Sequence, residues 1–238
     1  MNHFRFLLII SIVLSMTGLS HGQLFSKERL SNLETFDSRP LSWGYFLGFN
    51  SYDFKFTYNR QFDDDNTDID VATQAGFNVG LIGDMRINDY LNLRFEPGIY
   101  FGQRNLTFPR IEEESDYLRE VKSTYVHLPL LLKVSTKRLN NFKPFVVAGI
   151  SKSINLGSNE NNPEDNYFGQ FRMTRNTNYY ELGFGIDFYL YYFKFSPSIR
   201  GVFATTDELV RDRNPLSPWT SNIASMKTRG VFINFTFQ

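Results

Sequence analysis

Strict alternation of side-chain type between residues 179 and 190 is the feature that most limits what this chain can fold into. Every even position in this stretch is apolar or aromatic, whereas the odd positions include Glu181, two glycines and Asp187. A period of two places successive side chains on opposite faces of a β-strand. The stretch therefore predicts a strand that separates two environments, one apolar and one able to accept charge.

Seven further segments show the same period, although two of them follow it less regularly. The eight segments span residues 43–58, 75–87, 91–101, 126–134, 142–154, 179–190, 193–203 and 231–237. The first changes phase after Asn50, which predicts a β-bulge there. The connections alternate between short and long, as is typical of transmembrane β-barrels. We therefore predict an all-β fold, an eight-stranded antiparallel up-and-down barrel in the outer membrane, with its apolar face towards lipid.

A soluble β-sandwich or lipocalin-like barrel would show the same alternation, with the apolar face turned inward. The positions of the aromatic residues favour the membrane barrel, because several lie near the short connections, where a membrane barrel carries an interfacial girdle. They are Trp43, Tyr90, Phe142, Tyr189, Tyr191 and Tyr192. An even number of strands places both termini on one side of the membrane, which we expect to be the periplasm.

The N-terminal residues predict a targeting segment. Arg5 precedes an apolar run that ends at Leu19, and small residues at Ser20 and Gly22 suit a cleavage site. We expect a cleaved signal peptide over residues 1–22, a periplasmic N-terminal segment over 23–41 and the barrel over 42–238. Three apolar residues of the second segment lie on one side of a possible short helix and form a possible partner contact, although a disordered tether is an alternative. They are Leu30, Leu33 and Phe36.

Charged residues on the polar faces of the strands predict an ion-pair network inside the barrel. An eight-stranded barrel is only wide enough to be filled by side chains, so we expect no pore. Buried charges are costly unless they are paired. The expected network comprises Asp84, Arg86, Arg94, Glu96, Lys133, Glu181, Asp187, Lys194 and Arg200.

Several classes of function find little support. The formal net charge is zero and cysteine is absent, so neither a nucleic-acid surface nor a thiolate site is expected. The acidic run at 63–68 resembles a calcium loop only loosely, because it lacks the glycine and terminal glutamate of an EF-hand. We expect no metal, cofactor or small-molecule substrate.

Catalysis would depend on His127, because the other two histidines fall within the expected signal peptide. A serine–histidine site would need Ser123 or Ser151, with an acid such as Glu120. Such a site at the barrel rim would suit an enzyme that modifies lipid A, which is the least favoured alternative. A histidine within the interior network is the simpler interpretation.

The stretch RPLSWGYFLGFNSYDFKFTYN, residues 39–59, resembles the start of the PorT (SprT) family of Bacteroidota. The matching residues are Pro40, Trp43, Gly44, Tyr45, Gly48, Phe49, Asn50, Tyr52, Asp53 and Phe54. Residues 75–238 resemble the broader outer-membrane β-barrel family of the same bacteria. Such barrels commonly end on an aromatic residue, whereas here Phe237 is followed by Gln238.

The resemblance implies a noncatalytic accessory barrel of the type IX secretion and gliding machinery, which exports proteins with C-terminal sorting domains. It implies outer-membrane lipid and other secretion components as partners. The alternative is a generic small barrel that binds surface ligands through its external loops. The two differ in whether loss of the protein impairs the export of other proteins.

Overall fold

The computed structural model describes residues 31–59, 68–109, 111, 117–162 and 171–238. The expected signal peptide, Leu30 and most of the acidic run at 63–68 lie outside the described residues. The elements considered below all lie in one compact unit, Asn32–Gln238. In the part of the chain that the structure describes, no helix has the length and apolarity that a membrane crossing requires.

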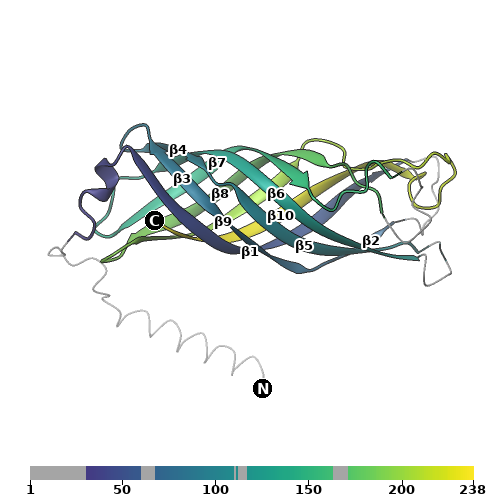
Figure 1. Ribbon diagram of the computed structural model, residues 1–238, viewed down its shortest axis with the longest axis horizontal. Coiled ribbons are helices and arrows are strands. Elements are labelled where there is room, and N and C mark those ends of the chain that lie inside the picture. The colour runs from purple at the N-terminus through teal and green to yellow at the C-terminus, as the bar shows by residue number, and fades with distance from the viewer. Residues whose placement is uncertain (1–30, 60–67, 110, 112–116, 163–170) are drawn as a thin grey trace, which may run out of the picture. The chain divides into compact units, whose positions relative to one another are not determined.

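Ten antiparallel β-segments form one sheet (Figure 1). They are β1 (Leu41–Tyr58), β2 (Asp70–Thr73), β3 (Ala75–Arg86), β4 (Leu91–Phe95), β5 (Gly98–Thr107), β6 (Leu118–Ser135), β7 (Phe142–Asn155), β8 (Asn176–Tyr189), β9 (Lys194–Ala204) and β10 (Ile223–Phe237). Because β2 continues into β3 and β4 continues into β5, the described segments make eight strands. The first strand pairs with both β3 and β10, which closes the sheet into a barrel. The predicted up-and-down barrel is confirmed.

Pro97 interrupts one strand without changing its faces. The sequence predicted a single strand over residues 91–101, and the structure divides it into β4 and β5. Leu81 donates its N–H to the Pro97 carbonyl at 2.9 Å, and Glu96 donates its N–H to the Pro129 carbonyl at 3.3 Å. The ladder therefore continues past a proline that cannot donate a hydrogen bond itself.

The first strand keeps one alternation over its whole length, so the bulge predicted after Asn50 is wrong. Its pairing with β10 stays in register until a shift between Thr57 and Tyr58. The apolar residues change face because the surroundings of the strand change. Before Asn50 most of them point outward, as Phe49 does at 58% exposed, although Phe46 points inward, and after Asn50 they point inward, as Phe54 does at 3%.

Other strands show the same change of polarity on their outer face. Along β6 the outward residues pass from the charged Glu120 to the apolar Val126, and along β10 they pass from Arg229 to Val231. The barrel wall thus has an apolar band and, beyond it, a section whose outer face is polar. Because lipid requires an apolar surface, the band is the section that spans the membrane.

We name the two ends of the barrel by their connections. The short-turn end, next to the apolar band, carries the turns at residues 87–90, 136–141 and 190–193. The long-loop end, next to the polar wall, carries the connections β1–β2, β5–β6, β7–β8 and β9–β10. The start of β1 and the end of β10 both lie at the short-turn end (Figure 1).

The long-loop end is filled by an apolar core, as in a water-soluble protein. Leu209 and Trp219 come from the connection between β9 and β10 and pack against inward residues of the strands. The buried residues of this core are Phe54, Ile69, Leu106, Phe108, Val121, Phe171, Met173, Leu209, Trp219, Ile223 and Met226. Within the described residues, this end of the barrel is therefore closed by packed side chains.

Replacing Phe184 with arginine is expected to lower the free energy of unfolding by about 2–4 kcal/mol, since the guanidinium would face hydrocarbon. Phe184 is 63% exposed at the middle of the outward residues of β8. Asn178→Arg is the matched control, because Asn178 lies on the same outward face beyond the apolar band. Urea unfolding in lipid vesicles measures both variants, and equal destabilisation would contradict the assignment of the band.

Candidate functional site

A chain of ion pairs crosses the interior of the barrel. Arg94 contacts Asp84 at 2.7 Å and Glu96 at 3.3 Å. Arg200 contacts Glu96 at 2.8 Å and Glu181 at 2.9 Å. These side chains come from four strand segments and the β4–β5 junction, and all are at most 5% exposed. Because the charges alternate in sign, each compensates its neighbour's loss of hydration.

The rest of the predicted charge network divides between the interior and the short-turn end. Lys133 contacts Asp187 at 2.5 Å in the interior. Lys194 is also buried, at 3% exposed. Arg86 lies at the rim, where it forms an ion pair with Asp89. The structure thus places eight of the nine expected residues in the interior and the ninth at its edge.

His127 lies in the middle of this interior. Its Nδ1 is 2.6 Å from Ser153 Oγ, and its Nε2 is 2.7 Å from Glu181 Oε1. A serine, a histidine and a carboxylate in line have the order of a nucleophilic triad. All three residues are at most 2% exposed, and the rings of Tyr100 and Phe232 pack on the histidine. A site enclosed in this way offers no room for a substrate.

The sequence-based catalytic alternative named Ser123, Ser151 and Glu120, and none of these makes the hydrogen bonds of the His127 ring. Ser151 is buried beside Glu181, the carboxylate that contacts the ring. Glu120 points outward and forms an ion pair with Lys122 at 2.8 Å. Ser123 lies 3.5 Å from the guanidinium of Arg104. Among the described residues, no group of three or more histidine and carboxylate side chains could hold a metal ion. The contact between His127 and Ser153 could not be predicted from the spacing of residues along the chain, because the register between β6 and β7 determines it.

The family motif on β1 is divided between the two faces of the strand. Trp43 and Phe49 point outward and are 70% and 58% exposed. Asn50 points inward, where its Nδ2 donates to Asn78 Oδ1 at 3.4 Å, and Asn78 in turn donates to Asn234 Oδ1 at 2.8 Å. This amide chain links β1 to both neighbouring strands.

Two motif glycines allow the wall to close. A Cβ at Gly44 would lie 2.1 Å from the Phe237 carbonyl oxygen, and one at Gly48 would lie 2.5 Å from the Ile233 carbonyl oxygen. Asp53 points outward and contacts Arg229 at 2.6 Å. The motif residues described here therefore hold the β1–β10 seam together.

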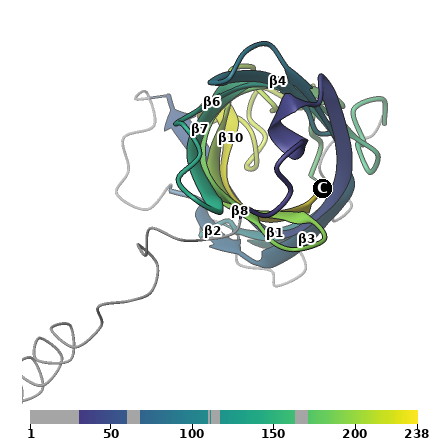
Figure 2. The same ribbon diagram turned by 90° about the vertical axis from the view of Figure 1, so that its left-hand side faces the viewer.

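A polar cavity of about 230 Å³ lies at the short-turn end. Its walls come from the 3₁₀ helix η2 (Phe36–Ser38), the start of β1, the turns of the barrel and the first residue of β9. Figure 2 looks into this end and shows the short purple helix lying across the mouth. The lining residues are Phe36, Asp37, Arg39, Ser42, Asp84, Arg86, Asn88, Asp89, Asn92, Lys137, Arg138, Lys143 and Lys194.

The helix η2 is fixed to the barrel by ring packing and hydrogen bonds. Phe36 is 8% exposed and packs edge-on against Tyr189, whose hydroxyl donates to Asp37 Oδ1 at 2.6 Å. Arg138 donates to the carbonyls of Asn32 and Leu33. Phe36, which the sequence suggested as a partner contact, therefore packs on the barrel, and the helix is shorter than the pattern from Leu30 suggested.

A second polar contact joins the β9–β10 connection to the barrel wall at the long-loop end. Glu208 is fully buried and accepts hydrogen bonds from the Thr228 N–H at 2.8 Å and the Thr228 hydroxyl at 3.0 Å. Burial raises the pKa of the Glu208 carboxyl, which Arg104 and these hydrogen bonds partly oppose. The connection is thus part of the packed interior.

Residues 23–210 match the family model of the outer membrane protein beta-barrel domain. The match covers most of the chain, and the protein belongs to this family of outer-membrane barrels.

Solved structures with a similar fold include OprG of Pseudomonas aeruginosa, with 11% identity, 83% of this chain and 93% of that chain covered, and a TM-score of 0.46. The match with Ail of Yersinia pestis has 13% identity and a TM-score of 0.35, and it covers 82% of this chain and 96% of the Ail chain. Neisserial surface protein A has 9% identity, with 83% and 98% covered and a TM-score of 0.40. A search of the curated proteins finds no match.

Proposed function

We propose that this outer-membrane barrel is a noncatalytic component of type IX secretion, required for the export of proteins with C-terminal sorting domains and for gliding where it occurs. The resemblance of residues 39–59 to the PorT family supports this role. The filled interior supports a role through surfaces and not through conduction. The noncatalytic part of the proposal is carried by the enclosed position of His127, Ser153 and Glu181, each at most 2% exposed.

The orientation that we propose places the short-turn end in the periplasm. The described chain enters the barrel at this end and leaves it there, since Gln238 exchanges backbone hydrogen bonds with Lys194 at the start of β9. Trp43 and Tyr192 are 70% and 93% exposed near the same end, where aromatic side chains suit the interface between lipid and water. Partners of the secretion system would then meet the rim of the cavity and η2.

Deletion of the gene in its source bacterium is expected to leave a sorting-domain cargo in the periplasm instead of the medium. The wild-type gene should restore export. Complementation with Gly157→Val should also restore it, because a Cβ at Gly157 meets its nearest neighbour at 3.6 Å, an ordinary contact. Fractionation and immunoblotting of the cargo measure the result.

Normal export and normal gliding in the deletion strain would overturn the secretion role. A ligand-binding barrel that acts through the long-loop end would then be the better explanation. Unchanged lipid A in a His127→Ala strain is the expected result for a noncatalytic barrel, and mass spectrometry of lipid A provides the check.

A further inference from the structure

The cavity at the short-turn end carries more positive than negative charge. Its walls hold six basic side chains and three carboxylates. The basic residues are Arg39, Arg86, Lys137, Arg138, Lys143 and Lys194, and the acidic residues are Asp37, Asp84 and Asp89. An excess of this kind within a partly enclosed space attracts anions.

Two of the three carboxylates are already paired with arginines. Asp84 contacts Arg94 at 2.7 Å below the cavity floor, and Asp89 forms an ion pair with Arg86 at the rim. Neither carboxylate therefore neutralises the remaining basic side chains by direct contact. The positive excess is concentrated on the lysines and arginines around η2.

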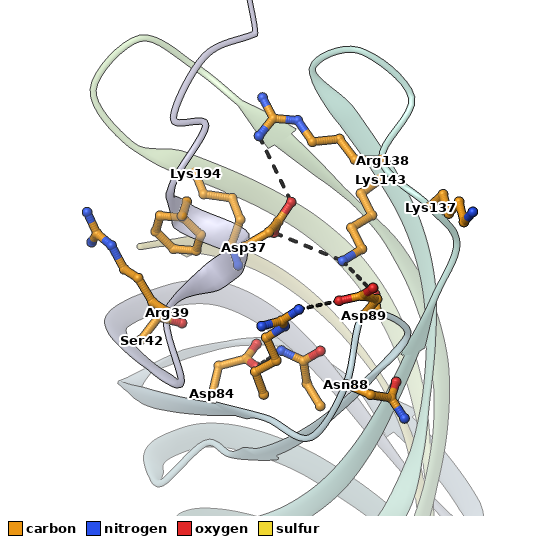
Figure 3. Close-up of a pocket in the computed structure, with 13 residues that line it drawn as sticks. Asp37, Arg39, Ser42, Asp84, Asn88, Asp89, Lys137, Arg138, Lys143 and Lys194 are labelled. Carbon is orange, nitrogen blue, oxygen red and sulfur yellow. Dashed lines mark hydrogen bonds and ion pairs between the residues drawn. The ribbon is translucent and has the colours of Figure 1, made fainter.

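Asp37 lies among the basic side chains around η2, but its contacts with them are long. Figure 3 shows its carboxylate directed towards Arg138 and Lys143, and each of these cations is 4.0 Å away. Its short hydrogen bond, at 2.6 Å, is instead to the hydroxyl of Tyr189. The chain itself thus places one carboxylate among these cations. Arg138 spends its hydrogen bonds on Asn32, Leu33 and residues 140–141, whereas Lys143 donates only to the Asp89 carbonyl, at 3.3 Å, and keeps further N–H donors.

Lys194 provides an independent indication of a ligand. It lines the cavity and is 3% exposed. Its Nζ lies 4.5 Å from the centroid of the Phe36 ring. The charges of Asp187, Asp84 and Asp37 act on it, but among the described residues its side chain has no hydrogen bond and no ion pair within 4.0 Å. A buried ammonium group without a hydrogen-bond acceptor is costly, and an anion in the cavity would supply the acceptor.

We propose that this cavity binds a carboxylate group, with Lys194 and Lys143 as donors and Arg39 at the entrance. A carboxylate is favoured because the chain already places one, that of Asp37, among the same cations. The group can come from an acidic side chain of a periplasmic polypeptide or from a free dicarboxylate. That the carboxylate comes from the periplasm rests on the orientation proposed above. Binding of a carboxylate by the purified protein can be tested without that orientation.

The test uses the full-length mature barrel in lipid nanodiscs and a fluorescent peptide that contains three glutamates. Fluorescence anisotropy is expected to show saturable binding that weakens as salt is added. Lys194→Gln should weaken it roughly tenfold or more, since it removes a charge-assisted hydrogen bond. Arg39→Gln, at an exposed position that does not affect folding of the interior, should weaken it less but measurably.

Three controls identify the ligand and its source. A peptide with glutamines in place of the glutamates should not bind, and Lys152→Gln, outward-facing on β7, should bind as the wild type does. Competition by succinate at similar concentration would favour a free dicarboxylate, and failure of succinate to compete would favour the polypeptide. Three results would each overturn the proposal. They are the absence of saturable peptide binding, equal affinity of the Lys194→Gln and Arg39→Gln variants for the peptide, and binding of inorganic phosphate without binding of the peptide.

Discussion

Arg200→Met is expected to lower the free energy of unfolding by about 3–5 kcal/mol. The Arg200 guanidinium lies between Glu96 and Glu181, at 2.8 Å and 2.9 Å. Methionine fills a similar length of the interior but leaves two buried carboxylates facing each other across it. Urea unfolding of the protein in lipid vesicles, followed by tryptophan fluorescence, measures the loss.

A second substitution tests whether the loss has an electrostatic origin. Adding Glu96→Gln to Arg200→Met should recover part of the stability, because it removes a carboxylate that is left with only its 3.3 Å contact to Arg94. Lys152→Met is the matched control: Lys152 is exposed on the outer face of β7, and its replacement should change stability by no more than about 0.5 kcal/mol. An additive double variant would show that packing, and not charge, explains the effect.

Gly48→Val is expected to weaken closure of the barrel between β1 and β10. A Cβ at this position would lie 2.5 Å from the Ile233 carbonyl oxygen and 2.4 Å from the Asn234 side chain. The carbonyl belongs to the backbone of the paired strand, so it cannot move away as the end of a flexible side chain could. We expect a destabilisation of about 3 kcal/mol, at the upper end of the usual cost of overpacking.

The resistance of the folded barrel to SDS at room temperature, seen as altered migration on a gel, provides the measurement. Gly157→Val again serves as the control, since its added Cβ meets only ordinary contacts. A folded fraction equal to that of the control would show that the seam tolerates a side chain at Gly48. In that case the family motif would require an explanation other than close approach of the strands.

Much of the barrel could be predicted from the sequence because the period of two is local information. The inward positions of Glu181 and Asp187 followed directly from their place in the 179–190 alternation. Their partners could be named only as a group. The contact of Arg200 with Glu96 joins residues on opposite sides of the interior, and that distance depends on the register of the whole ring.

The sequence was less informative where the surroundings of a strand change. Residues 118–125 were not predicted as strand, because their outward positions turn charged while inward positions such as Val121 turn apolar. The same reversal on β1 was interpreted as a bulge. The cavity at the short-turn end was also not predicted, because η2 has only three residues and shows no periodicity.

The polar outer wall at the long-loop end has a consequence for biogenesis. A chain delivered to the side that holds its termini must carry the outward-facing Asp53, Glu120 and Lys122 through hydrocarbon before they reach water on the far side. The transient cost is of the order of 2–4 kcal/mol for each basic side chain at the bilayer midplane and less for each acid. Unassisted insertion would therefore face a kinetic barrier set by residues that make no unfavourable contact in the finished barrel. A catalyst of insertion should therefore change the rate of assembly strongly, whereas the stability of the finished barrel should not depend on it.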